Sequence, residues 1–303
     1  MLNVLKDLTG IVCTIYRLFQ IPMVAHRAAL ISILSFTGYP GMVLSSVYVI
    51  PHGDEIISKK NAEAARLNSL ISDLSSGDTS DTMVILSPHG LRISDSVAVI
   101  NTEWLHGDLV ISGLRLRRKY RVHRDLANQI ANLMDGFTRS ATFITTGGPK
   151  SVFPLDFGSL IPLSFFSPEK VVAIGQPRIA NREKLVEFGK LLGNALISFP
   201  GNVSVIFSAD QAHTHASDGP YGYSPKAKLY EEAIRAALTE TNFSYLMKMS
   251  EDTIDEAKPD SFWNMLILSG LLESTGKMMQ YDFGYVEHYF GMMLAHSIPS
   301  VQS

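Results

Sequence analysis

The sequence predicts a single α/β domain in which helices flank a central sheet that is mostly parallel or mixed. The main observation is that short apolar segments of strand length alternate with amphipathic segments of helix length. A second is that 46% of the 303 residues are hydrophobic, which is enough to fill one large core. A third is that several strand-like segments end in polar residues, as they do where α/β sheets bind ligands.

Residues 1–41 stand outside the alternating pattern. This stretch is apolar in patches, but Arg17, His26 and Arg27 interrupt it. The longest uncharged run after Arg27 is about twelve residues, whereas a membrane-spanning helix needs about 20. We also find no convincing signal-peptide cleavage site. We therefore expect a non-essential N-terminal extension at 1–41, one folded domain at 42–303, and no membrane partner.

The expected elements begin at residue 43. The strand-like runs are short and rich in Val and Ile, whereas the helical ones place apolar residues three or four positions apart. We expect residues 250–296 to be mainly helical. The strands are expected at 43–50, 82–87, 93–102, 170–175 and 202–210, and the helices at 58–76, 122–137, 181–196 and 224–240.

Charge and cysteine usage exclude several classes of function. The net charge is −3, so no domain-wide basic field exists to hold nucleic acid, and we expect no nucleic-acid partner. The basic run at 115–124 is expected to be a solvated strand or loop edge. Because Cys13 is the single cysteine, an intrachain disulfide and a thiolate metal cluster are excluded. This suits a reducing, cytoplasmic setting, and any metal must be held by imidazole and oxygen.

Two of the expected strands end in the same tripeptide, Pro-His-Gly. It places His52 and His89 at strand ends, where proline stiffens the chain and glycine permits a sharp turn or a close approach. Asp210, His213 and His215 follow a third strand. Because ligands of such sheets bind beyond the carboxyl ends of the strands, we expect these side chains to gather at one edge.

Five motifs in sequence order resemble the class III extradiol ring-cleaving dioxygenases, the LigB family typified by the catalytic subunit of protocatechuate 4,5-dioxygenase. The resemblance covers roughly residues 45–296 and implies a LigB-like catalytic domain at 42–303. It also implies non-haem Fe(II)-dependent cleavage of a catechol-type or aminophenol-type ring by O2. The motifs are "VIPHGDEI" at 49–56, "ILSPHG" at 85–90, "LDFGSLIPL" at 155–163, "SADQAHTH" at 208–215 and "DSFWNMLILSGLL" at 260–272.

The resemblance implies a metal-ligand set. His52 and His89 match the two histidine ligands of the family, and Asp260 matches the carboxylate ligand by its distance from the following tryptophan. The family more often has glutamate there, so Glu251 and Glu256 remain alternatives, and a helix cap is the structural alternative for Asp260. The expected ion is Fe(II), with Zn(II) as the alternative.

The resemblance also implies roles around the metal. His213 matches the acid–base histidine, and Asp210 either orients a neighbouring group or caps the chain. His215 has no firm counterpart. Tyr221 either lines the pocket or lies on the surface. The family usually has histidine where this chain has Phe157, which favours a less polar substrate.

Three alternatives stay open beside the dioxygenase. Two histidines and an aspartate also suit a zinc hydrolase. The related Memo-like proteins share the fold and would make the protein regulatory, although they carry a C-terminal cysteine that this chain lacks. The change at Phe157 is also compatible with lost activity. For the enzyme, the expected partners are a small aromatic substrate and O2, in a homodimer that a small partner subunit could accompany.

Overall fold

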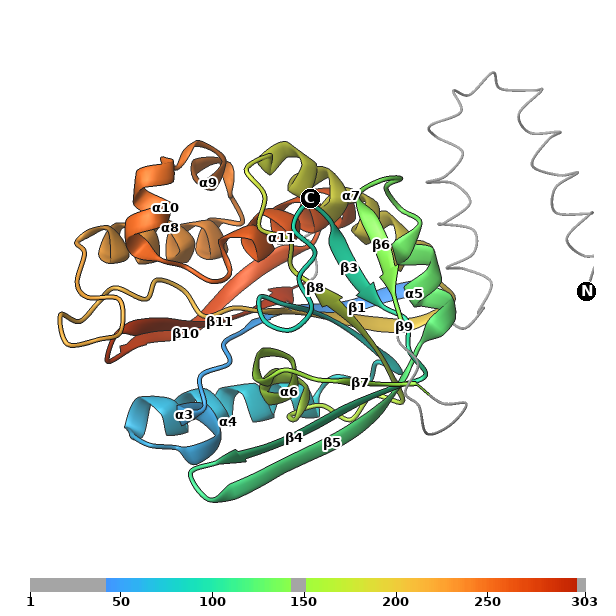
Figure 1. Ribbon diagram of the computed structural model, residues 1–303, viewed down its shortest axis with the longest axis horizontal. Coiled ribbons are helices and arrows are strands. Elements are labelled where there is room, and N and C mark those ends of the chain that lie inside the picture. Colours follow the sequence, from blue (N-terminus) through green and yellow to red (C-terminus); the bar gives the residue numbers. More distant parts are fainter. Residues whose placement is uncertain (1–41, 143–150, 299–303) are drawn as a thin grey trace, which may run out of the picture. The chain divides into compact units, whose positions relative to one another are not determined.

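The computed structural model describes residues 42–142 and 151–298, so the expected extension at 1–41 lies outside the described residues. Within them, eleven strands form one mixed sheet (Figure 1). The sheet runs in the order β10-β11-β1-β9-β2-β8-β5-β4-β7, and β3 pairs with both β6 and β8. The strands are β1 (Met42–Ile50), β2 (Thr82–Ser87), β3 (Val97–Ile100), β4 (Trp104–Ile111), β5 (Leu114–Val122), β6 (Thr138–Ala141), β7 (Val152–Pro154), β8 (Lys170–Gly175), β9 (Gly201–Ser208), β10 (Met278–Glu287) and β11 (Phe290–Ile298).

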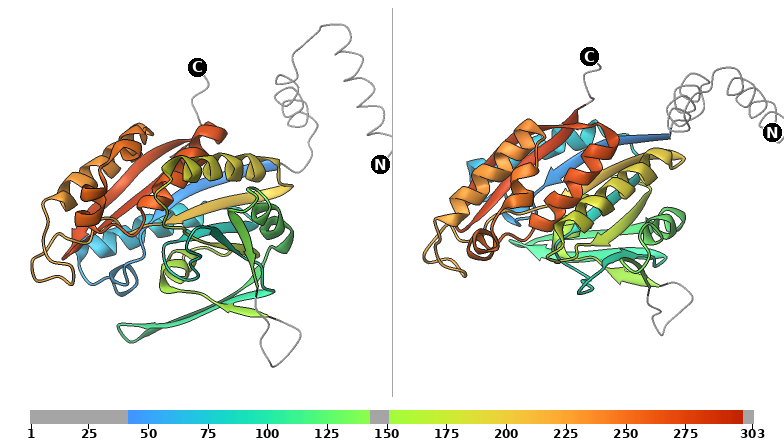
Figure 2. Two further views of the ribbon diagram at one scale, coloured as in Figure 1. Left: turned by 45° about the horizontal axis from the view of Figure 1, so that its top comes forward. Right: turned by 90° about the horizontal axis from the view of Figure 1, so that it is seen from above.

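Helices cover both faces of the sheet. Figures 1 and 2 show α7, α8 and α11 on one face and α4 and α6 on the other. The arrangement confirms the predicted α/β domain with a mixed, helix-flanked sheet. The helices are α3 (Glu55–Ser58), α4 (Ala62–Ser76), α5 (Arg124–Ala131), α6 (Phe157–Leu163), α7 (Arg182–Ser198), α8 (Lys226–Glu240), α9 (Ser244–Lys248), α10 (Glu251–Ala257) and α11 (Phe262–Thr275).

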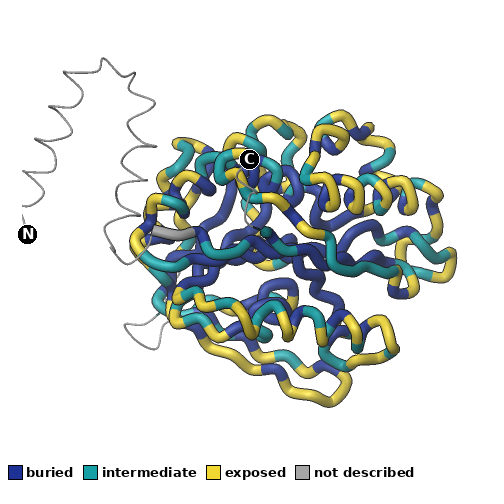
Figure 3. Tube along the Cα trace, turned by 180° about the vertical axis from the view of Figure 1, so that it is seen from behind, coloured by how far each residue is buried: buried dark blue, intermediate teal, exposed yellow. Residues whose placement is uncertain are grey.

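The core lies between the sheet and its helices, where the tube in Figure 3 is mostly buried. β2 is buried along its whole length, as expected for a strand covered on both faces. α11 packs against α7 through two glycines that allow their backbones to approach closely. A Cβ atom on Gly189 would collide with the Ile267 carbonyl, and one on Gly270 with the Val186 carbonyl. Among the described helices, none combines the length and the apolar character that a membrane crossing requires.

The C-terminal part differs from the sequence expectation. Residues 250–296 were expected to be mainly helical, but the segment after α11 forms the antiparallel hairpin β10–β11, and β11 continues the sheet by pairing with β1. The hairpin turns at His288, whose φ is +52°. The segment is rich in aromatic residues, which favour strands, and β11 buries its apolar side chains in the core. The tertiary contact with β1 therefore decides the structure of this segment.

Two smaller differences concern the middle of the chain. The helix expected at 122–137 ends at Ala131, and a turn follows. The basic run at 115–124 lies mostly in β5, where its charged side chains are exposed, in agreement with the expected solvated strand.

The sheet register brings three strand ends to one level. β1, β9 and β2 are adjacent and parallel. Ile50 at the end of β1 pairs with Ser208 at the end of β9, and Leu86 of β2 pairs with Phe207. The loops that follow these strands therefore leave the sheet side by side.

Candidate metal centre

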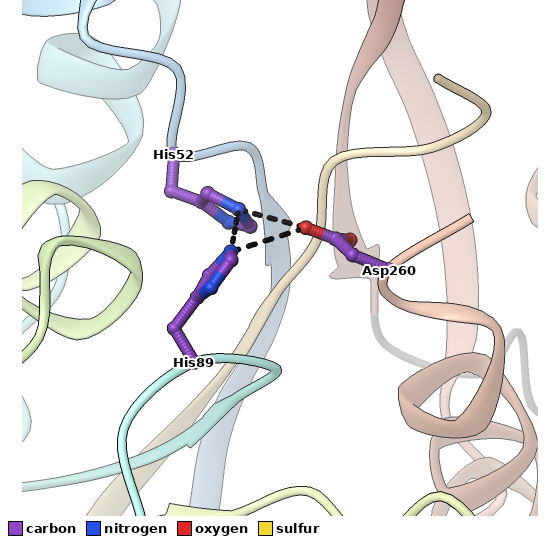
Figure 4. A group of neighbouring side chains, drawn as sticks. All are labelled: His52, His89 and Asp260. Atoms are coloured by element: carbon purple, nitrogen blue, oxygen red, sulfur yellow. Dashed lines mark hydrogen bonds and ion pairs between the residues drawn. The ribbon is translucent and has the colours of Figure 1, made fainter. Parts of the chain in front are cut away.

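The loops after β1 and β2 bring two imidazoles together above the sheet edge. His52 follows β1 and His89 follows β2, and their Nε2 atoms lie 3.2 Å apart. His52 is buried, whereas the side chain of His89 is 32% exposed. Figure 4 shows both rings pointing toward one carboxylate, that of Asp260.

Asp260 reaches the histidines from just before α11. Its Oδ2 atom lies 3.0 Å from Nε2 of His52 and 3.3 Å from Nε2 of His89. Its Oδ1 atom is buried, and among the described residues it has no hydrogen-bond partner. Since buried polar atoms are nearly always paired, this oxygen marks a place where a further group is expected.

A hydrogen-bond chain fixes the ring of His52. The Ser208 hydroxyl donates to the Gly158 carbonyl at 2.6 Å, and it lies 2.9 Å from Nδ1 of His52. Because the serine hydroxyl donates its hydrogen to the carbonyl, its oxygen accepts a hydrogen bond from Nδ1–H of His52. In the neutral ring this leaves the lone pair on Nε2, the atom that faces His89 and Asp260.

The loop of His89 is held by Asp156. The His89 amide donates to the Ser87 hydroxyl, which donates to Oδ1 of Asp156 at 2.7 Å. Asp156 also caps α6 by accepting from the Ser159 amide. Gly90 has a φ of +84°, and a Cβ atom there would lie 2.6 Å from Oδ2 of Asp156. The expected glycine turn is therefore present after His89.

The glycine of the first Pro-His-Gly tripeptide has a different role from Gly90. Gly53 does not adopt a left-handed conformation. A Cβ atom on it would lie 2.8 Å from Sδ of Met292 and 3.0 Å from the Phe290 ring. Gly53 therefore permits a close approach of β11 to the loop of His52, one of the two roles expected for a glycine at this position.

Buried carboxylates dominate the electrostatics. Burial would lower the pKa of His52, but Asp210 and Asp260 raise it to about 9. Burial would raise the pKa of Asp260, but His52 and His89 hold it well below its usual range. Burial raises the pKa of Asp210, whose Oδ1 atom accepts the His52 amide at 2.9 Å. Without an ion, the carboxylates thus draw a proton onto His52, and a bound cation would displace that proton.

The donor atoms fit one metal ion. Ligands held at about 2.0–2.2 Å from one ion lie roughly 2.8–3.6 Å apart in octahedral or tetrahedral geometry. The three distances among His52, His89 and Asp260 are 3.0, 3.2 and 3.3 Å. Asp210, His213 and Asp260 form a second group with metal-binding spacing, and Asp260 is common to both groups.

A comparison with protein families identifies the chain. The family described as the catalytic LigB subunit of aromatic ring-opening dioxygenase matches residues 45–295. The chain belongs to the LigB family.

Two individual proteins are similar to this LigB chain. Protein CA_C1420 of Clostridium acetobutylicum is 24% identical over 260 residues, which cover 80% of this chain and 55% of that protein. The chain therefore spans about half the length of this curated relative. The crystal structure of the uncharacterized protein JW3007 from Escherichia coli K12 matches with a TM-score of 0.58 and 15% identity, covering 83% of this chain and 98% of that one. That likeness supports the fold.

The alternative carboxylates lie elsewhere in this LigB domain. Glu251 is exposed and forms an ion pair with Arg182. Glu256 accepts a hydrogen bond from the Ser224 hydroxyl at 2.6 Å. Asp260 is the candidate whose carboxylate meets the two histidines.

His213 lies beside the three converging residues. Its Nδ1 atom donates to the Gln211 carbonyl at 2.8 Å, which leaves Nε2 of the neutral ring as a proton acceptor. The ring stacks on Phe290 with centroids 5.7 Å apart and an interplanar angle of 15°. The Asp210 carboxylate neighbours it and accepts a hydrogen bond from the His52 backbone amide, so it contacts the ligand loop.

The remaining predicted site residues differ in their closeness to the centre. Phe157 is 43% exposed, and its ring centroid lies 4.2 Å from that of His89 and 5.6 Å from that of His52. Tyr221 is exposed, with its ring 6.0 Å from that of His213. His215 turns away and pairs with Glu231 at 3.3 Å.

Sequence reasoning missed the residues that join the ligand loops. Asn264 in α11 donates to the carbonyls of Leu86 and Ser208, so it ties the ends of β2 and β9 to the helix that follows Asp260. Gln176 donates to the Asp260 carbonyl at 2.7 Å and accepts the Asn264 amide at 3.1 Å. Asn264 stands within the fifth motif and Ser208 begins the fourth, but nothing in their spacing shows that they meet.

Proposed function

We propose that this protein is a cytoplasmic, non-haem Fe(II)-dependent extradiol dioxygenase that cleaves a catechol-type or aminophenol-type ring with O2. Membership of a family of ring-opening dioxygenases supports the reaction class. The observation that carries the proposal is the convergence of His52, His89 and Asp260 within 3.3 Å, with one buried oxygen of Asp260 that has no partner in the part of the chain that the structure describes.

His52, His89 and Asp260 would hold the ion through Nε2, Nε2 and the carboxylate. Bound by two histidines and one carboxylate, Fe(II) supplies open positions at which a catechol and O2 can be activated together. Two of these ligands are held in position before an ion binds. Ser208 fixes the tautomer of His52, and the Ser87–Asp156 pair holds the backbone of His89.

His213 would act as the acid–base residue that accepts and returns the substrate proton. Its Nε2 atom is the free acceptor of the neutral ring, since Nδ1 donates to the Gln211 carbonyl. An imidazole with this tautomer can take a proton from a catechol hydroxyl and later return it to the product. Stacking on Phe290 keeps the plane of the ring fixed while the proton moves.

Phe157 would shape the substrate space. Its half-exposed ring lies against His89, so it shields that imidazole from water and offers a flat apolar surface beside the centre. A planar aromatic substrate can pack on such a ring.

The proposal is tested by anaerobic reconstitution with Fe(II), followed by oxygen and a panel of catechols and aminophenols. The expected result is oxygen consumption together with a yellow ring-opened product, and neither should appear with the Zn(II)-loaded protein. Tight zinc binding without turnover of any panel member would overturn the dioxygenase proposal in favour of the hydrolase or Memo-like alternative.

A further inference from the structure

His215 and Glu231 form a nearly buried polar pair beside the loop that carries His213. Nε2 of His215 lies 3.3 Å from Oε1 of Glu231, and the two side chains are 13% and 12% exposed. The same oxygen accepts a hydrogen bond from the backbone amide of Ala212 at 3.0 Å. One carboxylate oxygen therefore holds the loop on both sides of His213.

The peptide group between Gln211 and Ala212 links Glu231 to His213. Its N–H donates to Glu231, and its carbonyl accepts a hydrogen bond from Nδ1 of His213 at 2.8 Å. Because a peptide group is planar, the direction of its N–H fixes the direction of its carbonyl. The Glu231 carboxylate therefore helps to decide whether this carbonyl faces the imidazole of His213.

The backbone on either side of this peptide group is bound to β11. The amide of Gln211 donates to the carbonyl of Gly291 at 2.8 Å, and the amide of Gly291 donates to the carbonyl of Ala212 at 3.0 Å. Gly291 also leaves room for the carboxylate, because a Cβ atom there would collide with Oε1 of Glu231. Glu231 reaches this place because α8 packs against β10 and β11 (Figure 1).

Glu231 is better suited to fixing geometry than to adding stability. Burial raises the pKa of its carboxyl group, and His215 opposes this by favouring the ionised form. A buried ion pair contributes little net stability, whereas the loss of one partner leaves the other uncompensated. A carboxylate also polarises the peptide group that donates to it, so the Gln211 carbonyl becomes a stronger acceptor for Nδ1–H of His213.

We propose that Glu231 and His215 are positioning residues for His213. Glu231 holds the peptide group between Gln211 and Ala212 in the orientation that keeps the proton on Nδ1 of His213, and His215 holds the Glu231 carboxylate in place. Nε2 of His213 then stays free to accept a proton. Without this support, the tautomer protonated on Nε2 becomes accessible, and that nitrogen cannot take a proton from a substrate hydroxyl. The acid–base role of His213 rests on the proposed function, whereas its tautomer does not.

Nitrogen NMR spectra of the protein with isotope-labelled histidines read the tautomer directly. They are recorded above neutral pH, where a free imidazole is neutral, with and without Zn(II), which is diamagnetic. His213→Gln identifies the signals of this ring among the nine histidines. Wild-type His213 should carry its proton on Nδ1. Glu231→Met, which keeps the length of the side chain but removes the acceptor, should populate the other tautomer, and Glu231→Gln, which keeps an oxygen, should restore most of the wild-type pattern.

Two further variants separate the pair from its surroundings. His215→Phe should shift the tautomer in the same direction as Glu231→Met but less, because Ala212 keeps its acceptor. Glu232→Met removes the next glutamate of α8, which is exposed, and should leave His213 unchanged. An unchanged His213 signal in Glu231→Met and His215→Phe, or an equal change in Glu232→Met, would overturn the proposal. If Glu231→Met does not fold, His215→Phe decides alone.

Turnover gives a second measurement if a catechol or an aminophenol is cleaved. Acid–base catalysis typically contributes about 100- to 10,000-fold, so Glu231→Met should lower kcat about tenfold to a hundredfold. KM and the affinity for Fe(II) should stay near the wild-type values, and Glu231→Gln should recover most of the rate. A loss of Fe(II) affinity as large as the loss of kcat would count against positioning of His213. If the tautomer shifts as expected but the wild type cleaves no ring, the proposed function fails and the positioning role stands.

Discussion

Nδ1 of His52 lies 2.9 Å from the Ser208 hydroxyl, and this contact joins a candidate metal ligand to the strand that runs beside its own. The hydroxyl donates a hydrogen bond to the carbonyl of Gly158, the residue after Phe157. The ligand ring, the end of β9 and the first turn of α6 therefore form one connected unit. A substitution in any part of this unit is therefore expected to change the affinity for the metal ion.

Replacement of Ser208 by alanine should weaken metal binding. Without the hydroxyl, Nδ1 of His52 loses its acceptor, and the tautomer with the proton on Nε2 becomes accessible. The loss of such a partner typically costs about 10- to 100-fold in metal affinity. Titration of the metal-free protein with Fe(II) under nitrogen, or with Zn(II), measures the effect.

Ser204→Ala is the matched control for that substitution. Ser204 is buried in the same strand and donates to Asp78 at 2.6 Å, away from the ligand loops. Its removal should lower the free energy of unfolding by about 1 kcal/mol without changing metal affinity. If Ser208→Ala binds metal as tightly as the wild type, the tautomer argument is wrong.

Replacement of Asp260 by asparagine should abolish the stabilisation that a metal ion gives. An ion that binds only the folded state adds about 2.7 kcal/mol at a free concentration of 100 times its dissociation constant. Thermal unfolding with added divalent ion and with a chelator should therefore give well-separated midpoints for the wild type. The two midpoints should coincide for Asp260→Asn.

Glu251→Gln is the comparison for Asp260→Asn, because the sequence leaves Glu251 as an alternative ligand. Glu251 pairs with Arg182 in the structure, so this variant should keep the full response to metal. A lost response in Glu251→Gln, together with a kept response in Asp260→Asn, would reverse the assignment of the carboxylate.

Local sequence signals were enough for the strand–helix alternation and for the two Pro-His-Gly turns. Each of these depends on residues that are close along the chain. The hairpin β10–β11 was missed because its pairing with β1 joins residues about 250 positions apart, as in the contact between Val47 and Ser297. Ser208 and Asn264 were missed as supports for the same reason. Their partners are set by the register of the sheet, which spacing in the sequence does not reveal.

Gly90→Ala should destabilise the protein more than Gly113→Ala does. Both glycines have positive φ, +84° and +80°, so each alanine carries a strain of about 1–2 kcal/mol. Only at Gly90 does the new methyl group meet a neighbour, the Oδ2 atom of Asp156 at 2.6 Å. Displacing Asp156 disturbs its bonds to Ser87 and Ser159, which should cost about 1–2 kcal/mol more.

Denaturant unfolding of both glycine variants, with metal titration of each, measures the difference. Gly90→Ala should also bind metal more weakly, because Asp156 holds the loop of His89. Gly113→Ala should bind it as the wild type does, since nothing lies within 4 Å of the added methyl group. Equal destabilisation and unchanged metal binding in both variants would refute a role for Asp156 in holding that loop.

Glu55→Gln should make the protein more stable above neutral pH. Burial, with smaller contributions from Asp54 and Glu287, raises the pKa of Glu55 from 4.5 to about 7. Between those values the folded chain holds a proton that the unfolded chain has released, so the free energy of unfolding falls as pH rises through this window. The neutral glutamine removes that fall.

The difference in unfolding free energy between Glu55→Gln and the wild type should therefore be largest near pH 8, on the order of 1–3 kcal/mol, and should shrink toward pH 5. Denaturant unfolding at several pH values measures it, with Glu63→Gln, an exposed glutamate in α4, as the control. Lys60 limits the size of the effect because it lies 3.7 Å from Glu55, but it remains paired with Glu287 at 3.4 Å in the variant. A pH-independent difference, or a variant less stable than the wild type at pH 8, would show that Glu55 is not held in an unfavourable charged state.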